Sequence, residues 1–126
     1  MPNRSSATSA RGPARRPANQ EERDIQAFIA EILADAPGRP LPAPSDFLAQ
    51  AAELGIAFEP GEVETLGRFL ALLLHANTRM NLTAIKDPDE AWRRHALDAL
   101  TLMAPLAELP EGATVIDIGT GGGVPG

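Results

Sequence analysis

The sequence has 126 residues, of which 44% are apolar, and this is enough for one small globular domain. It contains no cysteine and only two, widely separated histidines, which excludes a disulfide framework and a thiolate metal site, so we expect no metal. Residues 1–20 carry four arginines and no acid, so the remainder holds 11 − 4 = 7 cations against 17 acids, a net charge of −10 that is not typical of a nucleic-acid binder.

Residues 1–19 are rich in Arg, Ser, Ala and Pro and lack large apolar side chains, so we expect a disordered tail. An organelle transit peptide is the alternative, which three prolines in this stretch disfavour. No apolar run near the N-terminus resembles a secretory signal, and none in the chain approaches the roughly 20 residues of a membrane span. We therefore expect a cytoplasmic protein.

Three helices are predicted in the first two thirds of the chain. Apolar residues at helical spacing predict a helix over residues 20–35, within an extra helical segment 20–36, and the proline-rich residues 37–44 predict a stiff linker. Ser45 is placed to cap a short helix that runs to Leu54, with Gly55 as its stop. Pro60 opens a third helix that fades around residues 77–81. Its apolar stripe consists of Val63, Leu66, Leu70 and Leu73.

A fourth helix has the clearest start signal of the chain, in "KDPDEAW". Asp87 caps it, Pro88 takes the first helical position and Glu90 completes a capping box, and the helix is expected to end near Pro105. Its apolar stripe consists of Trp92, His95, Ala96, Ala99, Leu100 and Met103. A turn at "PEG" then leads into a buried-type strand over residues 114–118, so a helical region 45–110 precedes a single strand.

A glycine-rich loop, "DIGTGGGVPG", follows this strand and places Gly119, Gly121 and Gly123 at alternate positions. Glycine there permits positive φ and lets the backbone approach a ligand. A dinucleotide fingerprint would need glycine where Val124 stands, and a P-loop would need lysine at the position after Gly126. The third interpretation is the loop of a methyltransferase that binds S-adenosylmethionine.

Segments upstream of the loop favour the third interpretation. The stretch "NLTAIKDPDEAWRRHALDAL", followed about 20 residues later by "VIDIGTGGGVPG", resembles the RsmG (GidB) family over residues 66–126. The resemblance implies a bacterial methyltransferase that modifies guanine N7 in small-subunit ribosomal RNA with S-adenosylmethionine as cofactor. It implies an α/β fold, in which a helical N-terminal region leads into the first strand and glycine loop of a Rossmann-like domain over residues 111–126.

The resemblance also implies roles for individual residues. Gly119 and Val124 would contact the cofactor, Gly121 and Gly123 would shape the loop, and Asp117 would brace it through backbone N–H groups. No catalytic acid or base is expected, because guanine N7 carries no proton. Three upstream residues would form a polar wall beside the loop and support the RNA side: Asn81, Arg94 and His95. A histidine on the apolar stripe of its helix is more often a hydrogen-bonded core group, and we favour this interpretation of His95; His75 is expected to be exposed.

The sequence reaches only the first methyltransferase motif, which predicts an incomplete Rossmann-like domain and a fragment inactive by itself. A lone strand would leave its backbone polar groups unpaired, so we expect the 126-residue chain, a monomer, to bind S-adenosylmethionine weakly or not at all. Two alternatives stay open. One is a truncated P-loop nucleotide-binding protein, and the other is a non-enzymatic helical interaction module.

Overall fold

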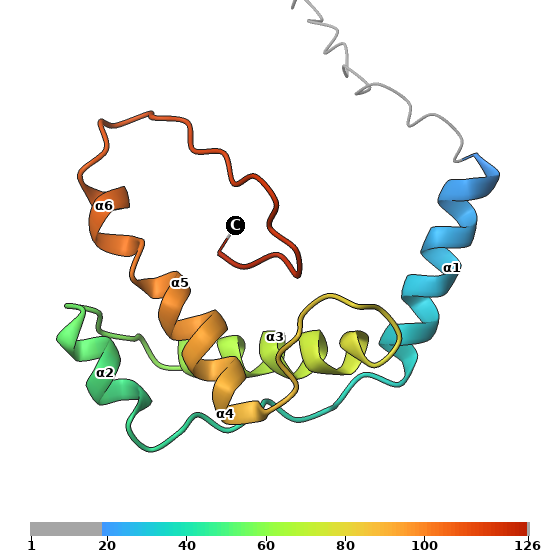
Figure 1. The fold of residues 1–126 in the computed structure, drawn as a ribbon, viewed down its shortest axis with the longest axis horizontal. Helices are drawn as coiled ribbons and strands as arrows, with labels where there is room; N and C mark the ends of the chain where they lie inside the picture. The colour runs from blue at the N-terminus through green and yellow to red at the C-terminus, as the bar shows by residue number, and fades with distance from the viewer. Residues whose placement is uncertain (1–18, 126) are drawn as a thin grey trace, which may run out of the picture.

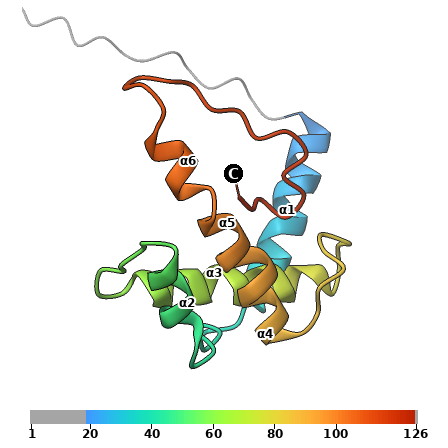
Figure 2. The same cartoon turned by 60° about the vertical axis from the view of Figure 1, so that its left-hand side comes forward.

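The computed structural model describes residues 19–125, and within that range all regular structure is helical. Helix α1 (Gln20–Ala34) leads through residues 37–44 to α2 (Phe47–Glu53) and then to α3 (Glu62–Asn77). A continuous rod follows, made of α4 (Pro88–Ala91), the π-helical segment η1 (Trp92–Leu97) and α5 (Asp98–Leu100), and it crosses α3 (Figures 1 and 2). Helix α6 (Met103–Ala107) comes next, and the chain then turns back toward α3 (Figure 1).

The hydrophobic core lies between α2, α3 and the rod. Its buried members are Phe47, Leu70, Leu73, Ile85, Ala91, Trp92 and Ala96. Trp92 is fully buried and meets the ring of Phe47 edge-on, with ring centroids 4.6 Å apart. The predicted stripe of the third helix is confirmed here, because Leu70 and Leu73 lie in this core. The stripe of the fourth helix is confirmed for Trp92 and Ala96 but not for Met103, which is 53% exposed.

Residues 37–44 have no regular structure, as their prolines predict, but they do not act as a free linker. This strap lies across α3, where the Leu41 N–H donates to the Gly67 carbonyl oxygen at 2.9 Å. Leu41 and Ala43 pack against the core cluster. A Cβ on Gly67 would lie 2.5 Å from the Leu41 oxygen, so the strap and the helix approach each other at a distance that glycine permits.

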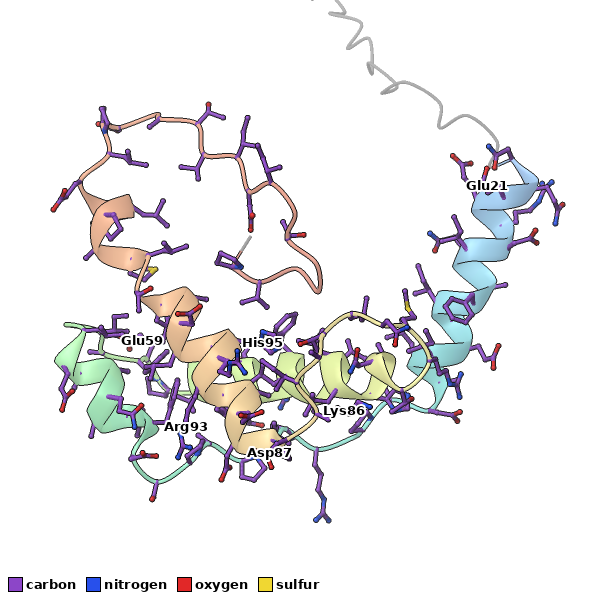
Figure 3. The ribbon with its side chains drawn as sticks, viewed as in Figure 1. Glu21, Glu59, Lys86, Asp87, Arg93 and His95 are labelled. Carbon is purple, nitrogen blue, oxygen red and sulfur yellow. The ribbon has the colours of Figure 1, made fainter. Side chains whose placement is uncertain are left out.

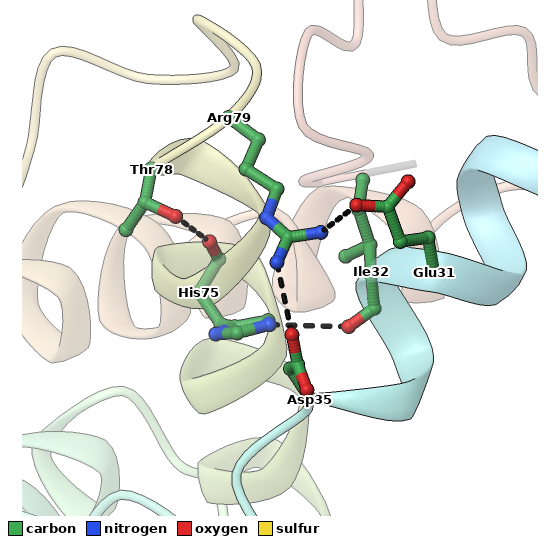
Figure 4. Close-up of polar contacts among 6 residues, drawn as sticks. All are labelled: Glu31, Ile32, Asp35, His75, Thr78 and Arg79. Atoms are coloured by element: carbon green, nitrogen blue, oxygen red, sulfur yellow. Dashed lines mark hydrogen bonds and ion pairs between the residues drawn. The ribbon is translucent and has the colours of Figure 1, made fainter.

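Helix α1 is fixed to the end of α3 by polar contacts around its own C-terminus (Figure 4). Arg79 bridges Glu31 at 3.2 Å and Asp35 at 2.9 Å, and His75 Nε2 lies 3.1 Å from the Ile32 carbonyl oxygen. The expectation that His75 is exposed is therefore wrong, because this half-buried ring satisfies a carbonyl that the helix end leaves without an intrahelical partner. The rest of the apolar stripe of α1 stays exposed, apart from Ile32.

Helix boundaries differ from the prediction in three places. The residue preceding α2 is Asp46, not Ser45, and neither provides a side-chain cap, because the Phe47 N–H bonds to the Pro44 carbonyl instead. Helix α3 begins at Glu62 rather than Pro60, since Gly61 takes a φ of +91°. The fourth helix stops at Leu100 and restarts as α6, so its predicted continuous run to Pro105 is interrupted.

The predicted start signal of the rod is confirmed in part. Asp87 Oδ1 accepts the Glu90 N–H at 2.9 Å and Pro88 occupies the first helical position. The reciprocal bond from Glu90 that would complete a capping box is absent among the described residues. The stop at Gly55 is confirmed, with a φ of +78°.

The predicted strand is not formed. Residues 114–118 have no regular structure, and Ile116 and Ile118 are 76% and 89% exposed. A strand requires a neighbour to pair with its N–H and C=O groups, and residues 19–125 provide none. The expected α/β fold is thus represented here by its helical region alone. The disordered tail was expected over residues 1–19, and residues 1–18 of it lie outside the described residues. No helix between residues 19 and 125 is long and apolar enough to cross a membrane.

Candidate functional site

The glycine loop adopts the backbone geometry that its glycines allow. Gly119, Gly121 and Gly123 have φ values of +80°, +57° and +88°, a region that side-chain-bearing residues rarely enter. No atom lies within 4 Å of where a Cβ would stand on Gly119 or Gly123, and the Gly123 N–H closes a turn onto the Thr120 carbonyl at 3.0 Å. The loop therefore presents open backbone at two of its three alternate glycines.

One side of the loop is seated on the helical unit. A Cβ on Gly122 would lie 2.7 Å from Leu73 Cδ1 of α3, and one on Gly121 would lie 3.8 Å from the Leu82 carbonyl oxygen. Val124 is half-buried and lines an apolar hollow of about 310 Å³ that side chains of α3, η1 and α5 complete. Val124 thus faces the helices, whereas Gly119 is open to solvent.

Asp117 is exposed and makes no side-chain hydrogen bond with any residue in the range 19–125. The brace that was expected of it is not formed in this structure. A carboxylate could hold the loop from the end of a strand, and since residues 114–118 form no strand, nothing fixes the position of Asp117 relative to the loop backbone.

His95 projects from η1 to the loop that follows α3 (Figure 3), where its Nε2 lies 3.0 Å from Thr83 Oγ1. Thr83 Oγ1 also accepts the Ile85 N–H at 3.1 Å, so its own proton is free to go to His95. Burial lowers the pKa of His95 below its ordinary value of 6.5, Arg94 lowers that pKa further, and Asp98 opposes the shift. If the ring is neutral and accepts from Thr83, then His95 Nε2, the Thr83 hydroxyl and the Ile85 N–H all have hydrogen-bond partners. This arrangement is typical of a structural histidine at the edge of a core.

The expected polar wall of Asn81, Arg94 and His95 is not one surface. Asn81 is exposed and lines a hollow at the end of α3, whereas Arg94 is exposed and lines a separate hollow with Ile85, Arg93 and Asp98. His95 faces Thr83 between them. Arg94 and His95 are neighbours in sequence on one helical segment, so their side chains leave it in different directions.

The sequence prediction missed Asn77, the last residue of α3. Its Oδ1 accepts the backbone N–H groups of Leu82 at 2.8 Å and Thr83 at 2.9 Å, and so it fixes the first turn of the following loop. The available signal was an asparagine where the helical pattern fades, since asparagine side chains commonly bond to nearby backbone in such places.

Open backbone at Gly119 and Gly123 would let a ligand approach the main chain closely. Comparison with known proteins identifies the family to which the chain belongs. Residues 62–126 match the family model described as GidB, rRNA small subunit methyltransferase G. The chain therefore belongs to this family, and the resemblance inferred from its motifs is confirmed.

Individual relatives bear the same description, Ribosomal RNA small subunit methyltransferase G. The protein of Sorangium cellulosum is 47% identical over 87 residues, which are 69% of this chain and 36% of that protein. The protein of Moorella thermoacetica is 47% identical over 78 residues, 62% of this chain and 32% of that protein. The chain thus spans about a third of the length of the curated relatives it matches. No solved structure matches it.

Proposed function

We propose that this chain takes part in the S-adenosylmethionine-dependent methylation of a guanine N7 in small-subunit ribosomal RNA. The observation that carries the proposal is the family match, which includes the glycine loop. The P-loop alternative is not retained, because the same loop falls inside the matched residues. The reaction would take place in the cytoplasm, with the protein as a monomer.

The loop is the part of this chain that fits the cofactor. Gly119 and Gly123 leave space where a Cβ would otherwise stand, so the N–H groups of the loop can come close to a ligand. We assign cofactor contact to Gly119 and Val124, loop shape to Gly121 and Gly123, and support to Asp117. When bound, S-adenosylmethionine supplies an electrophilic methyl group on its sulfonium.

The residues of this chain act by positioning rather than by proton transfer. Guanine N7 presents a lone pair and carries no proton, so no general base is assigned, and the barrier is lowered by holding the two partners in line and close together. Leu73 and Leu82 support this role, because they seat the loop against α3 at Gly122 and Gly121. The helical unit would thereby fix the position of the methyl donor.

Contact with RNA has to come from few cations, since residues outside the N-terminal 20 carry a net charge of −10. Lys86 and Arg94 are exposed, the first on the loop that follows α3 and the second on η1. We assign them to RNA phosphates, with Asn81 and His95 in supporting positions. Arg93 is less suited, because it lies 4.0 Å from Asp46.

A chimera tests the proposal, because the chain spans only about a third of its relatives. Residues 62–126 replace the matching segment of the Sorangium cellulosum protein, and the chimera is incubated with small ribosomal subunits and labelled S-adenosylmethionine. We expect label in the RNA at an N7-methylated guanine, detected by chain cleavage at that base. An inactive chimera that folds and binds the subunits would refute the proposal.

Two glycines provide a matched pair for the loop itself. Gly119 and Gly112 both have a φ of +80° and both have empty space where a Cβ would stand, so Gly119→Ala and Gly112→Ala impose the same backbone strain. Only Gly119 lies in the proposed cofactor loop. We expect Gly119→Ala to raise the KM for S-adenosylmethionine at least tenfold in the chimera and Gly112→Ala to leave it unchanged; equal effects would assign both glycines to turn geometry.

A non-enzymatic helical interaction module is the second candidate. It is supported by the exposed apolar side chains of α1 and by the fact that all regular structure within residues 19–125 is helical. The chimera separates the two candidates, because a module of this kind would yield a folded protein without methyl transfer.

A further inference from the structure

A hollow of about 440 Å³, lined mostly by residues with polar side chains, lies where α3 ends and the next loop begins. Its lining consists of Leu74, Asn77, Thr78, Asn81, Thr83 and Lys86. Its volume equals that of roughly fifteen water molecules at ~30 Å³ each, which is room for a purine base. Leu82, which stands in sequence between the lining residues Asn81 and Thr83, links this region to the glycine loop, because its carbonyl oxygen lies 3.8 Å from where a Cβ would stand on Gly121.

The side-chain amide of Asn77 has a fixed orientation in this hollow. Its Oδ1 accepts two backbone N–H groups, from Leu82 and Thr83, and a nitrogen could accept neither of them. The NH₂ group is therefore on the other side of the amide plane, and it has no acceptor among residues 19–125. Asn77 thus offers two N–H donors to whatever occupies the hollow.

Two further groups complement these donors. Thr78 Oγ1 donates its proton to the His75 carbonyl at 2.7 Å, which leaves its lone pairs to accept a hydrogen bond. Lys86 is exposed, lines the hollow and makes no ion pair within the described residues. The hollow therefore combines an amide donor, a hydroxyl acceptor and a cation.

We propose that this hollow holds the target guanine, with Asn77 Nδ2 donating to O6, Thr78 Oγ1 accepting from the N1–H edge and Lys86 facing the phosphate of the same nucleotide. The inference rests on the proposed function and deepens it. A donor aimed at O6 leaves the neighbouring N7 lone pair unbonded, as a nucleophile requires. Adenine carries an amino group where guanine has O6, so the Asn77 donor would meet another donor and adenine would be rejected.

Asn77→Asp is the decisive variant. It keeps an oxygen for the Leu82 and Thr83 N–H groups, so the loop stays fixed, while it removes the NH₂ donors. Gln26→Glu makes the same amide-to-carboxylate change at an exposed position of α1 and serves as the control for added charge.

The 126-residue chain is titrated with nucleotides and followed by NMR. We expect 5′-GMP and its 7-deaza analogue, which both keep O6 and the N1–H, to shift the amide signals of Leu82 and Thr83. The 2-aminopurine nucleotide, which lacks both O6 and the N1–H, should bind at least about tenfold more weakly. Asn77→Asp should weaken the binding of 5′-GMP about tenfold and leave the binding of the 2-aminopurine nucleotide unchanged. Charge repulsion from the new carboxylate would weaken both nucleotides, so a loss confined to 5′-GMP identifies the missing donor. Equal binding of the two nucleotides, unchanged 5′-GMP binding by Asn77→Asp, or no shift at millimolar 5′-GMP would each overturn the inference.

The chimera distinguishes a failure of this inference from a failure of the proposed function. Normal methylation by a chimera that carries Asn77→Asp would overturn the guanine pocket and keep the methyltransferase function. Nucleotide binding in the expected order together with an inactive chimera would keep the pocket and overturn the function.

Discussion

Replacing Gly67 with alanine tests how the strap is held on α3. Alanine favours a helix over glycine by about 1 kcal/mol, so local propensity predicts stabilisation. The structure predicts the opposite, because the new Cβ would lie 2.5 Å from the Leu41 carbonyl oxygen, and ordinary contact begins at 3.4 Å, which requires a displacement of 3.4 − 2.5 = 0.9 Å. That oxygen belongs to the backbone, and Trp92 Cζ2 lies only 3.3 Å from the same point, so neither neighbour yields easily.

The size of the effect follows from what the displacement breaks. Moving the strap disrupts the bond between the Leu41 N–H and the Gly67 carbonyl, whose loss costs about 1 kcal/mol. It also disturbs the packing of Leu41 against the core, and overpacking of this kind costs about 1–3 kcal/mol. After the gain in propensity, we expect Gly67→Ala to lower the free energy of unfolding by about 2 kcal/mol.

Urea unfolding measures this directly, with helix content followed by circular dichroism and the core followed by fluorescence of the single tryptophan, Trp92. Gly38→Ala is the control, because Gly38 lies in the same strap with no atom within 4 Å of its Cβ position, and its effect should be small. A higher unfolding midpoint for Gly67→Ala, with an unchanged slope, would refute the close contact between strap and helix.

Three further variants test the helix docking, the half-buried His95 and the caps. Arg79→Met removes the ion pairs to Glu31 and Asp35, so it should speed hydrogen exchange throughout α1 while lowering global stability by less than about 1 kcal/mol. As a control, Arg68→Met breaks an exposed ion pair within α3 and should leave hydrogen exchange in α1 unchanged. Because burial lowers the pKa of His95 from 6.5, the folded state binds this proton less readily than the unfolded chain. The stability that the neutral His95 ring contributes is therefore present above pH 6.5 and is lost as the pH falls below 6.5. In urea melts between about pH 7.5 and 5.5, His95→Gln should remove this part of the pH dependence. Asp87→Ala should lower the free energy of unfolding by about 1 kcal/mol in thermal melts, whereas Ser45→Ala should have almost no effect, because the Asp87 side chain caps a helix and that of Ser45 does not. Equal losses would contradict the observed caps.

The helices and their buried faces could be predicted because the signal for them is local. Apolar residues three and four positions apart in α3 and the rod define stripes that the core then uses. Asp87 and Pro88 mark the start of the rod within two residues of each other, and the structure places them as predicted. Such signals need nothing from the rest of the chain.

The features that sequence reasoning missed depend on contacts between distant residues. His75 bonds to a carbonyl 43 residues earlier, and Gly67 is close to the strap because of how the strap crosses α3. The strand over residues 114–118 fails for a related reason, since its apolar pattern is correct but a strand exists only with a paired neighbour. Periodicity identifies which secondary structure a segment favours, whereas the His75 hydrogen bond, the Gly67 contact and the pairing of a strand depend on which distant residues lie next to it in the fold.

The short motifs that carry the family resemblance are far apart in sequence, and the structure gives a physical reason for their joint occurrence. Asn77 fixes the backbone of Leu82 and Thr83, Thr83 bonds to His95 of the rod, and the Leu82 carbonyl is the atom nearest to Gly121 of the glycine loop. The "NLT" segment is therefore the joint at which α3, the rod and the loop meet. A change in any one of the three would shift the other two, so the position of the glycine loop depends on residues far from it in sequence.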